Sequence, residues 1–232
     1  MHPRPTTLVA CSHGTRSAEA SALVTALVDA VTDRLPGTPV VEMYVDVQQP
    51  ELESALPRLE GEAVVVPLFL SGGYHLHHDI HRAAAVHPRA MVSAPLGPDP
   101  VLTDLLMQRL VAAGWRAGDA VVLAASASSD PRAVQDVRRA ATLLSERVGA
   151  EVGIGVVGGA GVQIGEAVAA ARRPGRRVAV ATYLLMPGFF HGRVLAAGAD
   201  LTAAPLLAGE PAAALVELIV SRFRHALHQR AA

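Results

Sequence analysis

The segment VVVPLFLSGGYHLHHDI runs from Val64 to Ile80 and indicates the fold class of this chain. It opens with branched apolar residues, which are typical of a strand buried on both faces of a parallel sheet. Gly72 and Gly73 allow the backbone to turn sharply where this strand ends. Open α/β sheets bind ligands at the carboxyl edge, so the residues after the turn lie where a ligand is expected. Four histidines follow the glycines: His75, His77, His78 and His81.

Strands and helices alternate on both sides of this segment. The other strands expected in the first half are Thr7–Cys11, Val40–Val45 and Met91–Ala94. The expected helices are Ser17–Arg34, Pro50–Leu59, His77–Ala85 and Asp99–Ala113. Four β-α units in succession predict a parallel sheet with helices on both faces.

The pattern restarts after a glycine-containing stretch, 113–118, which we interpret as a linker. LVACSH at Leu8–His13 corresponds to VVLAAS at Val121–Ser126, and PLFLSGGYH at Pro67–His75 corresponds to TYLLMPGFF at Thr182–Phe190, at nearly the same offset. This repetition predicts two tandem α/β domains, 1–115 and 116–232, each with a four-stranded parallel sheet. The second copy has Ser126 and Phe190 where the first has His13 and His75. A site built on these imidazoles therefore belongs to the first domain.

The composition limits the classes of partner and the cellular compartment. The 232 residues carry a formal net charge of −1 and a pI near 6.8, which argues against nucleic acid or a membrane surface as the main partner. The single cysteine, Cys11, excludes an internal disulfide and a cysteine-rich zinc site, and we expect it to be a buried, unreactive thiol. The chain has no membrane-length apolar stretch and no signal-peptide pattern at its start, so we expect a soluble cytoplasmic protein.

Three side chains follow the ends of three predicted strands: His13, Asp46 and His75. Because parallel strands end at the same edge of a sheet, these side chains can converge on one site. Two imidazoles and a carboxylate suit a divalent first-row metal with open coordination positions. A single histidine at a strand end is more often a structural residue. The matched placement of two, and their loss in the second copy, favours a functional site.

The remaining histidines of the segment allow a second interpretation. His77 and His81 are four residues apart and would share one face of a helix, where they could bind a metal or form a solvated helix start. His78 would point elsewhere, and we expect it at the surface.

Taken together, these motifs resemble the sirohydrochlorin chelatases, the class II tetrapyrrole chelatases, in their long two-domain form. The resemblance rests on Leu8–Ala10 with Ser12–Arg16, on Asp46 with Gln49 and Pro50, on the Val64–Ile80 segment, and on Tyr183–Phe190 in the second half. It implies two chelatase-like α/β subdomains facing a central cleft. It also implies a lyase that inserts Co²⁺ or Fe²⁺ into sirohydrochlorin, towards cobalamin or sirohaem. The metal is then a substrate, no organic cofactor is expected, and the internal repeat suggests a monomer.

The resemblance also assigns roles to residues. It places the two metal-site histidines of the family at His13 and His75, and its acidic site residue, usually Glu, at Asp46. The aspartate reaches one methylene less far. The substrate is a flat macrocycle with peripheral carboxylates. We expect it to contact the following residues: Arg16, Ser71, Gly72, Gly73, Tyr74 and His191, with Arg82, Arg193 and the pair Phe189–Phe190 as further candidates.

Two other functions remain as alternatives. His13-Gly14-Thr15-Arg16 faintly resembles the histidine phosphatases, but those sites have an arginine directly before the histidine, and Ser12 stands there in this chain. A non-enzymatic metal carrier could instead use the cluster His75–His81, and it would bind metal without turnover.

Overall fold

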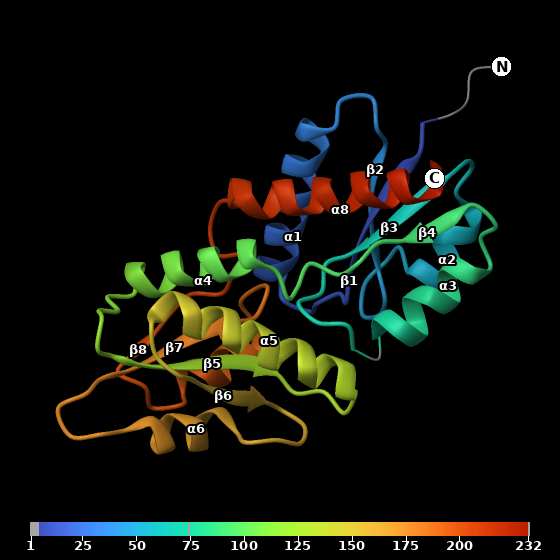
Figure 1. Ribbon diagram of the computed structural model, residues 1–232. Helices are drawn as coiled ribbons and strands as arrows, with labels where there is room; N and C mark the ends of the chain where they lie inside the picture. Colours follow the sequence, from blue (N-terminus) through green and yellow to red (C-terminus); the bar gives the residue numbers. More distant parts are fainter. Residues whose placement is uncertain (1–4, 74, 232) are drawn as a thin grey trace. The chain divides into compact units, whose positions relative to one another are not determined.

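The computed structural model describes residues 5–73 and 75–231, apart from the side chains of residues 75–77 and 231. The chain folds into two compact units (Figure 1). Unit 1 comprises Met1–Leu96 and Gly209–Ala232, and unit 2 comprises Gly97–Ala208. Each unit contains a four-stranded parallel sheet, which confirms the predicted α/β class and the tandem repeat.

The sheet of unit 1 has the strand order β2-β1-β3-β4. Its strands are β1 (Thr7–Ser12), β2 (Val40–Tyr44), β3 (Ala63–Pro67) and β4 (Ala90–Val92). Its helices are α1 (Ala18–Arg34), α2 (Leu52–Ala55), a 3₁₀ turn (Leu56–Arg58), a π-helix (His75–Ile80), α3 (His81–Ala85) and α8 (Ala213–Ala231). The central strands β1 and β3 are buried along their whole length, as the branched apolar composition predicts.

Helices cover both faces of this sheet. On one face, Val9 and Val65 of the central strands pack in one apolar cluster with Leu52, Ile80 and Ala83 from the α2 and α3 side. α8 contacts both β3 and α1, and Figure 1 shows α1 and α8 side by side. The sheet whose strand ends carry the predicted site residues is therefore packed on both faces by helices.

The sheet of unit 2 repeats this topology with the order β6-β5-β7-β8. Its strands are β5 (Ala120–Ser126), β6 (Val152–Val157), β7 (Val178–Tyr183) and β8 (Leu201–Thr202). Its helices are α4 (Pro100–Ala112), α5 (Pro131–Val148), α6 (Ile164–Ala171) and α7 (Phe189–Leu195). Figure 1 shows β5 and β6 between α5 and α6. Among the described residues, no helix is both long and apolar enough to span a bilayer.

The division into units differs from the predicted domains 1–115 and 116–232. α4 packs on α5 and β7 of unit 2, whereas α8 packs on unit 1, so the chain passes between units after Leu96 and again after Ala208. The stretch predicted as a linker is a hydrogen-bonded turn inside unit 2. There the Trp115 N–H donates to the Leu110 carbonyl at 3.0 Å, and Arg177 donates to the Gly114 carbonyl at 3.1 Å. Its glycines mark a tight turn between α4 and β5 and not a domain boundary.

Several elements differ from the expected ones for local reasons. Only Leu52–Ala55 of the helix expected at Pro50–Leu59 is α-helical, and a 3₁₀ turn containing Pro57 follows, because proline cannot donate the next helical hydrogen bond. A π-helix at His75–Ile80 precedes α3, where an α-helix was expected from His77. In the second half, α7 was not expected, and the fourth strand of the predicted sheet, the two-residue β8, was not located in the sequence. Both elements are too short to give a clear periodicity.

An arginine anchors each of the two helices at the crossover points. From α8, the Arg222 Nε donates to the Pro95 carbonyl at 2.9 Å, and its Nη2 donates to the Leu96 carbonyl at 3.1 Å. From α4, the Arg109 Nη2 donates to the carbonyls of Leu206 and Ala208 at 3.2 and 3.0 Å. In both units, the arginine binds the last backbone carbonyls before the chain leaves that unit. These hydrogen bonds attach Pro95–Leu96 to α8 in unit 1 and Leu206–Ala208 to α4 in unit 2.

We expect Arg222→Met to lower the free energy of unfolding by about 1.5–3 kcal/mol, because hydrogen bonds from a charged donor to partly buried carbonyls are lost while the apolar stem is kept. Urea unfolding followed by circular dichroism measures this change. Arg224→Met, on the exposed side of the same helix, is the matched control and should have little effect. Equal effects of the two substitutions would show that Arg222 does not anchor the segment.

Candidate functional site

The hydrogen bonds between β1 and β2 continue beyond the ends of the strands. The Val45 N–H donates to the Ser12 carbonyl at 2.9 Å, and the Asp46 N–H donates to the His13 carbonyl at 3.0 Å. His13 is half-buried and Asp46 is exposed. The structure therefore brings these two predicted site residues together as backbone neighbours at the carboxyl edge of the unit 1 sheet.

A tight turn centred on Val47 holds Asp46 in place. The Gln48 N–H donates to the Asp46 carbonyl at 2.8 Å, and Val47 has a φ of 70°. This is the pattern of a three-residue γ-turn with positive φ, a strained conformation for a β-branched residue. The Asp46 Oδ1 also accepts the Val47 N–H at 2.7 Å, which orients the carboxylate. Strained backbone of this kind is concentrated at functional sites in proteins.

Gly14, the residue after His13, lies against this turn. Its φ is +93°, and a Cβ added there would lie 2.1 Å from the Asp46 carbonyl oxygen. Both the backbone conformation and the close approach therefore require glycine. The contact sets how closely the His13 loop approaches Asp46.

We expect Gly14→Ala to destabilise the fold more than Gly37→Ala does. Gly37 has a similar φ of +83°, but nothing lies within 4 Å of its added Cβ, so only backbone strain is incurred there. At Gly14 the clash should add at least about 1 kcal/mol to that strain. Thermal or urea unfolding of both variants measures the difference. Equal losses would mean that the loop moves away from Asp46 without cost.

The end of β3 lies at the same edge of the sheet. The Leu68 N–H donates to the Cys11 carbonyl at 2.8 Å, which continues the pairing of β1 with β3. Of the predicted substrate contacts that follow, Gly72 is buried, while Ser71 and Gly73 are half-buried. Tyr74 lies outside the described residues. The backbone of His75 opens the π-helix, but its side chain also lies outside the described part, so its role remains a prediction.

Cys11 has the properties predicted for an unreactive thiol. Its side chain is fully buried in β1, and burial raises its pKa to about 12. A thiol with such a pKa carries almost no thiolate at neutral pH, and the thiolate is the reactive form.

We therefore expect a thiol-reactive disulfide reagent to leave Cys11 of the native protein unmodified at neutral pH. The same reagent should modify one thiol per chain in urea, where the side chain is exposed. The absorbance of the thiolate released from the reagent gives the number of thiols modified per chain, both in the native protein and in urea. Rapid modification of the native protein would contradict this assignment.

The other predicted contacts lie at several places. Arg16 is exposed in the loop after His13, and Arg82 forms an exposed ion pair with Glu53 at 3.0 Å. In unit 2, His191 is half-buried on α7. The two preceding phenylalanines at the start of that helix are exposed, Phe189 by 78% and Phe190 by 43%. Their ring centroids are 5.9 Å apart.

The histidine cluster gives no metal site in the described part of the chain. His78 is exposed, as predicted, and its Nδ1 lies 3.2 Å from the Asp79 carboxylate. His81 is also exposed. Among the residues whose side chains are described, no group of three or more His, Cys, Asp or Glu side chains could hold a metal ion. The side chain of His77 lies outside the described part, so its predicted shared face with His81 remains a prediction.

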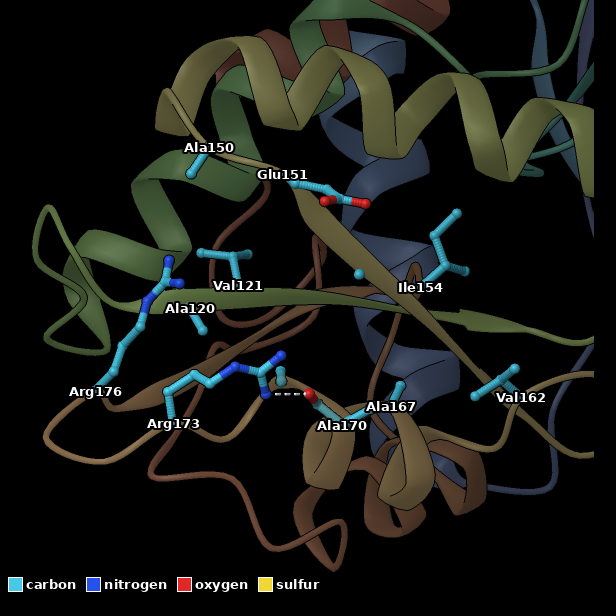
Figure 2. A pocket seen from close by; sticks show the side chains of 12 residues that line it. Ala120, Val121, Ala150, Glu151, Ile154, Val162, Ala167, Ala170, Arg173 and Arg176 are labelled. Atoms are coloured by element: carbon cyan, nitrogen blue, oxygen red, sulfur yellow. Dashed lines mark hydrogen bonds between the residues drawn. The ribbon is translucent and has the colours of Figure 1, made fainter.

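A cavity of about 400 Å³ lies elsewhere, in unit 2 near the amino ends of β5 and β6 (Figure 2). Small apolar side chains line most of it, together with Glu151, Arg173 and Arg176. The Arg173 Nη1 donates to the Ala170 carbonyl at 2.9 Å, and the Arg176 Nε donates to the Gly118 carbonyl at 2.8 Å. These arginines therefore donate hydrogen bonds to backbone carbonyls at the end of α6 and in the turn before β5. No predicted site residue lines this cavity.

Sequence reasoning missed one polar residue of the unit 1 edge, Gln48. Its Oε1 accepts the Thr15 N–H at 2.7 Å, and its Nε2 donates to the Ser21 Oγ at 3.0 Å. No periodicity or motif marks such a residue, because its partners lie far away in the sequence.

Comparison with known proteins finds one matching family model and several similar folds. Residues 7–113 match the family model described as CbiX. That range contains β1 to β4, the loops with His13 and Asp46, and the histidine segment. No curated protein matches the chain closely enough to count as a relative.

Three solved structures resemble the whole chain. SirB from Bacillus subtilis with Fe³⁺ matches with a TM-score of 0.82 and 20% identity, over 98% of both chains. The sirohydrochlorin chelatase SirB from Bacillus subtilis subspecies spizizenii in complex with cobalt matches with a TM-score of 0.78 and 20% identity, over 97% of this chain and 96% of that one. CbiX, the terminal enzyme for biosynthesis of siroheme in denitrifying bacteria, matches with a TM-score of 0.70 and 24% identity. The match covers 93% of this chain and 98% of that one. At these identities, the likeness shows the fold.

Proposed function

We propose that this protein is a sirohydrochlorin chelatase that inserts a divalent metal, Co²⁺ or Fe²⁺, into sirohydrochlorin for cobalamin or sirohaem synthesis. The match of residues 7–113 to the CbiX family model supports this proposal. The observation that carries the proposal is the backbone hydrogen bond from the Asp46 N–H to the His13 carbonyl. It holds both residues at the carboxyl edge of the unit 1 sheet, within the matched range. The solved SirB structures that share the fold hold Fe³⁺ and cobalt. We further propose that it acts as a monomer in the cytoplasm, since one chain supplies both repeats.

The chemistry of metal insertion suits these residues. As the metal enters the ring, two pyrrole N–H bonds break and two protons leave, so the site must bind a cation and accept protons. Neutral imidazoles of His13 and His75 would bind the incoming metal, because imidazole is a good ligand for first-row divalent ions. The Asp46 carboxylate, oriented through its Oδ1, would accept protons from the ring.

The macrocycle requires apolar and cationic contacts. We include Arg16 as a partner for its peripheral carboxylates, since a guanidinium binds a carboxylate through two hydrogen bonds. Ser71, Gly72, Gly73 and Tyr74 belong to the turn that precedes His75. In unit 2, we include His191 together with the exposed Phe189 and Phe190, because aromatic rings provide a large apolar surface for a flat ligand.

We expect His13→Ala to lower the rate of metal insertion at least about 100-fold, the range for loss of a group that moves protons or holds the metal. The absorbance change of sirohydrochlorin with Co²⁺, and separately with Fe²⁺, under anaerobic conditions measures this rate. His78→Ala, at an exposed position, is the matched control and should retain the wild-type rate.

Equal rates in wild type and His13→Ala would contradict the assignment of this residue. Metal binding without turnover that depends on His77 and His81 would instead identify a metal carrier. Hydrolysis of a phosphomonoester would favour the phosphatase alternative.

A further inference from the structure

We propose that Gln48 is a positioning residue that fixes the His13 loop against Asp46. This inference rests on the proposed function, because it assigns Gln48 to the same site. Gln48 follows the strained turn at Val47 and is half-buried between two loops.

The side-chain amide of Gln48 forms hydrogen bonds through both its oxygen and its nitrogen. The Oε1 accepts the backbone N–H of Thr15, two residues after His13, at 2.7 Å. The Nε2 donates to the Ser21 Oγ in the first turns of α1 at 3.0 Å. One side chain from the β2 loop therefore holds both the loop after β1 and the start of the helix that follows it.

The hydrogen bonds continue from the loop into the helix. The Thr15 Oγ1 accepts the Ser17 N–H at 3.1 Å, and the Ser17 Oγ accepts the Ala20 N–H at 3.2 Å as the N-cap of α1. The His13 loop is thus fixed at one end by its β1 strand and at the other by a capped helix. The hydrogen bond from the Thr15 N–H to the Gln48 Oε1 links this loop to the loop that carries Asp46.

Gln48 is also rigidly tied to Asp46. The turn at Val47 places the Gln48 N–H on the Asp46 carbonyl at 2.8 Å. A shift of Gln48 relative to Thr15 is therefore a shift of Asp46 relative to His13. Displacements of about 1 Å between reacting groups can cost 100-fold in rate, so a bond that removes this freedom affects turnover.

The two partners predict how substitutions at this position rank. Gln48→Ala removes both bonds. Gln48→Glu keeps an acceptor for the Thr15 N–H, and the Ser21 hydroxyl can then donate to the carboxylate. Ser21→Ala removes only the helix partner and leaves the bond to Thr15.

The experiment measures kcat and KM for Co²⁺ insertion, and separately the affinity for Co²⁺ without tetrapyrrole by titration calorimetry. We expect Gln48→Ala to lower kcat and Co²⁺ affinity by about 10- to 100-fold, the usual effect of losing a residue that orients a metal site. The KM for sirohydrochlorin should change little. Gln48→Glu and Ser21→Ala should stay within about 5-fold of wild type, because the Thr15 bond remains. Gln108→Ala, exposed on α4, is the matched control and should equal wild type.

Wild-type kcat and Co²⁺ affinity in a folded Gln48→Ala variant would overturn the proposal. Equal impairment of Gln48→Glu and Gln48→Ala would also overturn it, since the acceptor would then be irrelevant. If the wild-type protein shows no metal insertion, the proposed function fails. The Co²⁺ affinities of the variants still test Gln48 in that case, because they do not depend on turnover.

Discussion

The hydrogen bonding of β1 with β2 past the ends of both strands is the constraint on which the site depends. The bonds from Val45 to Ser12 and from Asp46 to His13 hold two loops at a fixed separation. Gly14 is required because this separation leaves no space for a Cβ, and the strained turn at Val47 follows where the second loop must leave the sheet. The local features of the site are thus consequences of one extended parallel ladder.

Duplication has produced two sheets with the same order but different edges. His13 follows β1 in unit 1, whereas Ser126 ends the equivalent strand β5 in unit 2. Each unit is completed by a helix whose arginine, Arg222 or Arg109, binds the carbonyls where the chain leaves that unit. The repeat therefore preserves the scaffold and its anchoring, while the imidazoles occur in the first copy.

The sequence alone predicts the features that depend on local composition. Buried parallel strands are recognisable in Val64–Pro67 and Val121–Ala125, and strand-end placement leads directly to His13 and Asp46. The unit boundary was not predictable in this way, because Gly114 and Gly118 signal a turn without showing which sheet α4 covers. Gln48 was not predicted as a site residue because its partner Thr15 is distant in the sequence. The two residues meet because β1 pairs with β2.

The central claim is that His13 binds the metal beside Asp46 at this edge. X-ray absorption at the cobalt edge, on protein loaded with Co²⁺ in the absence of tetrapyrrole, tests it most directly. The account predicts imidazole scattering around the metal in the wild-type protein and its reduction in a His13→Ala variant. An unchanged spectrum in that variant would contradict the account, because the metal would then be bound elsewhere.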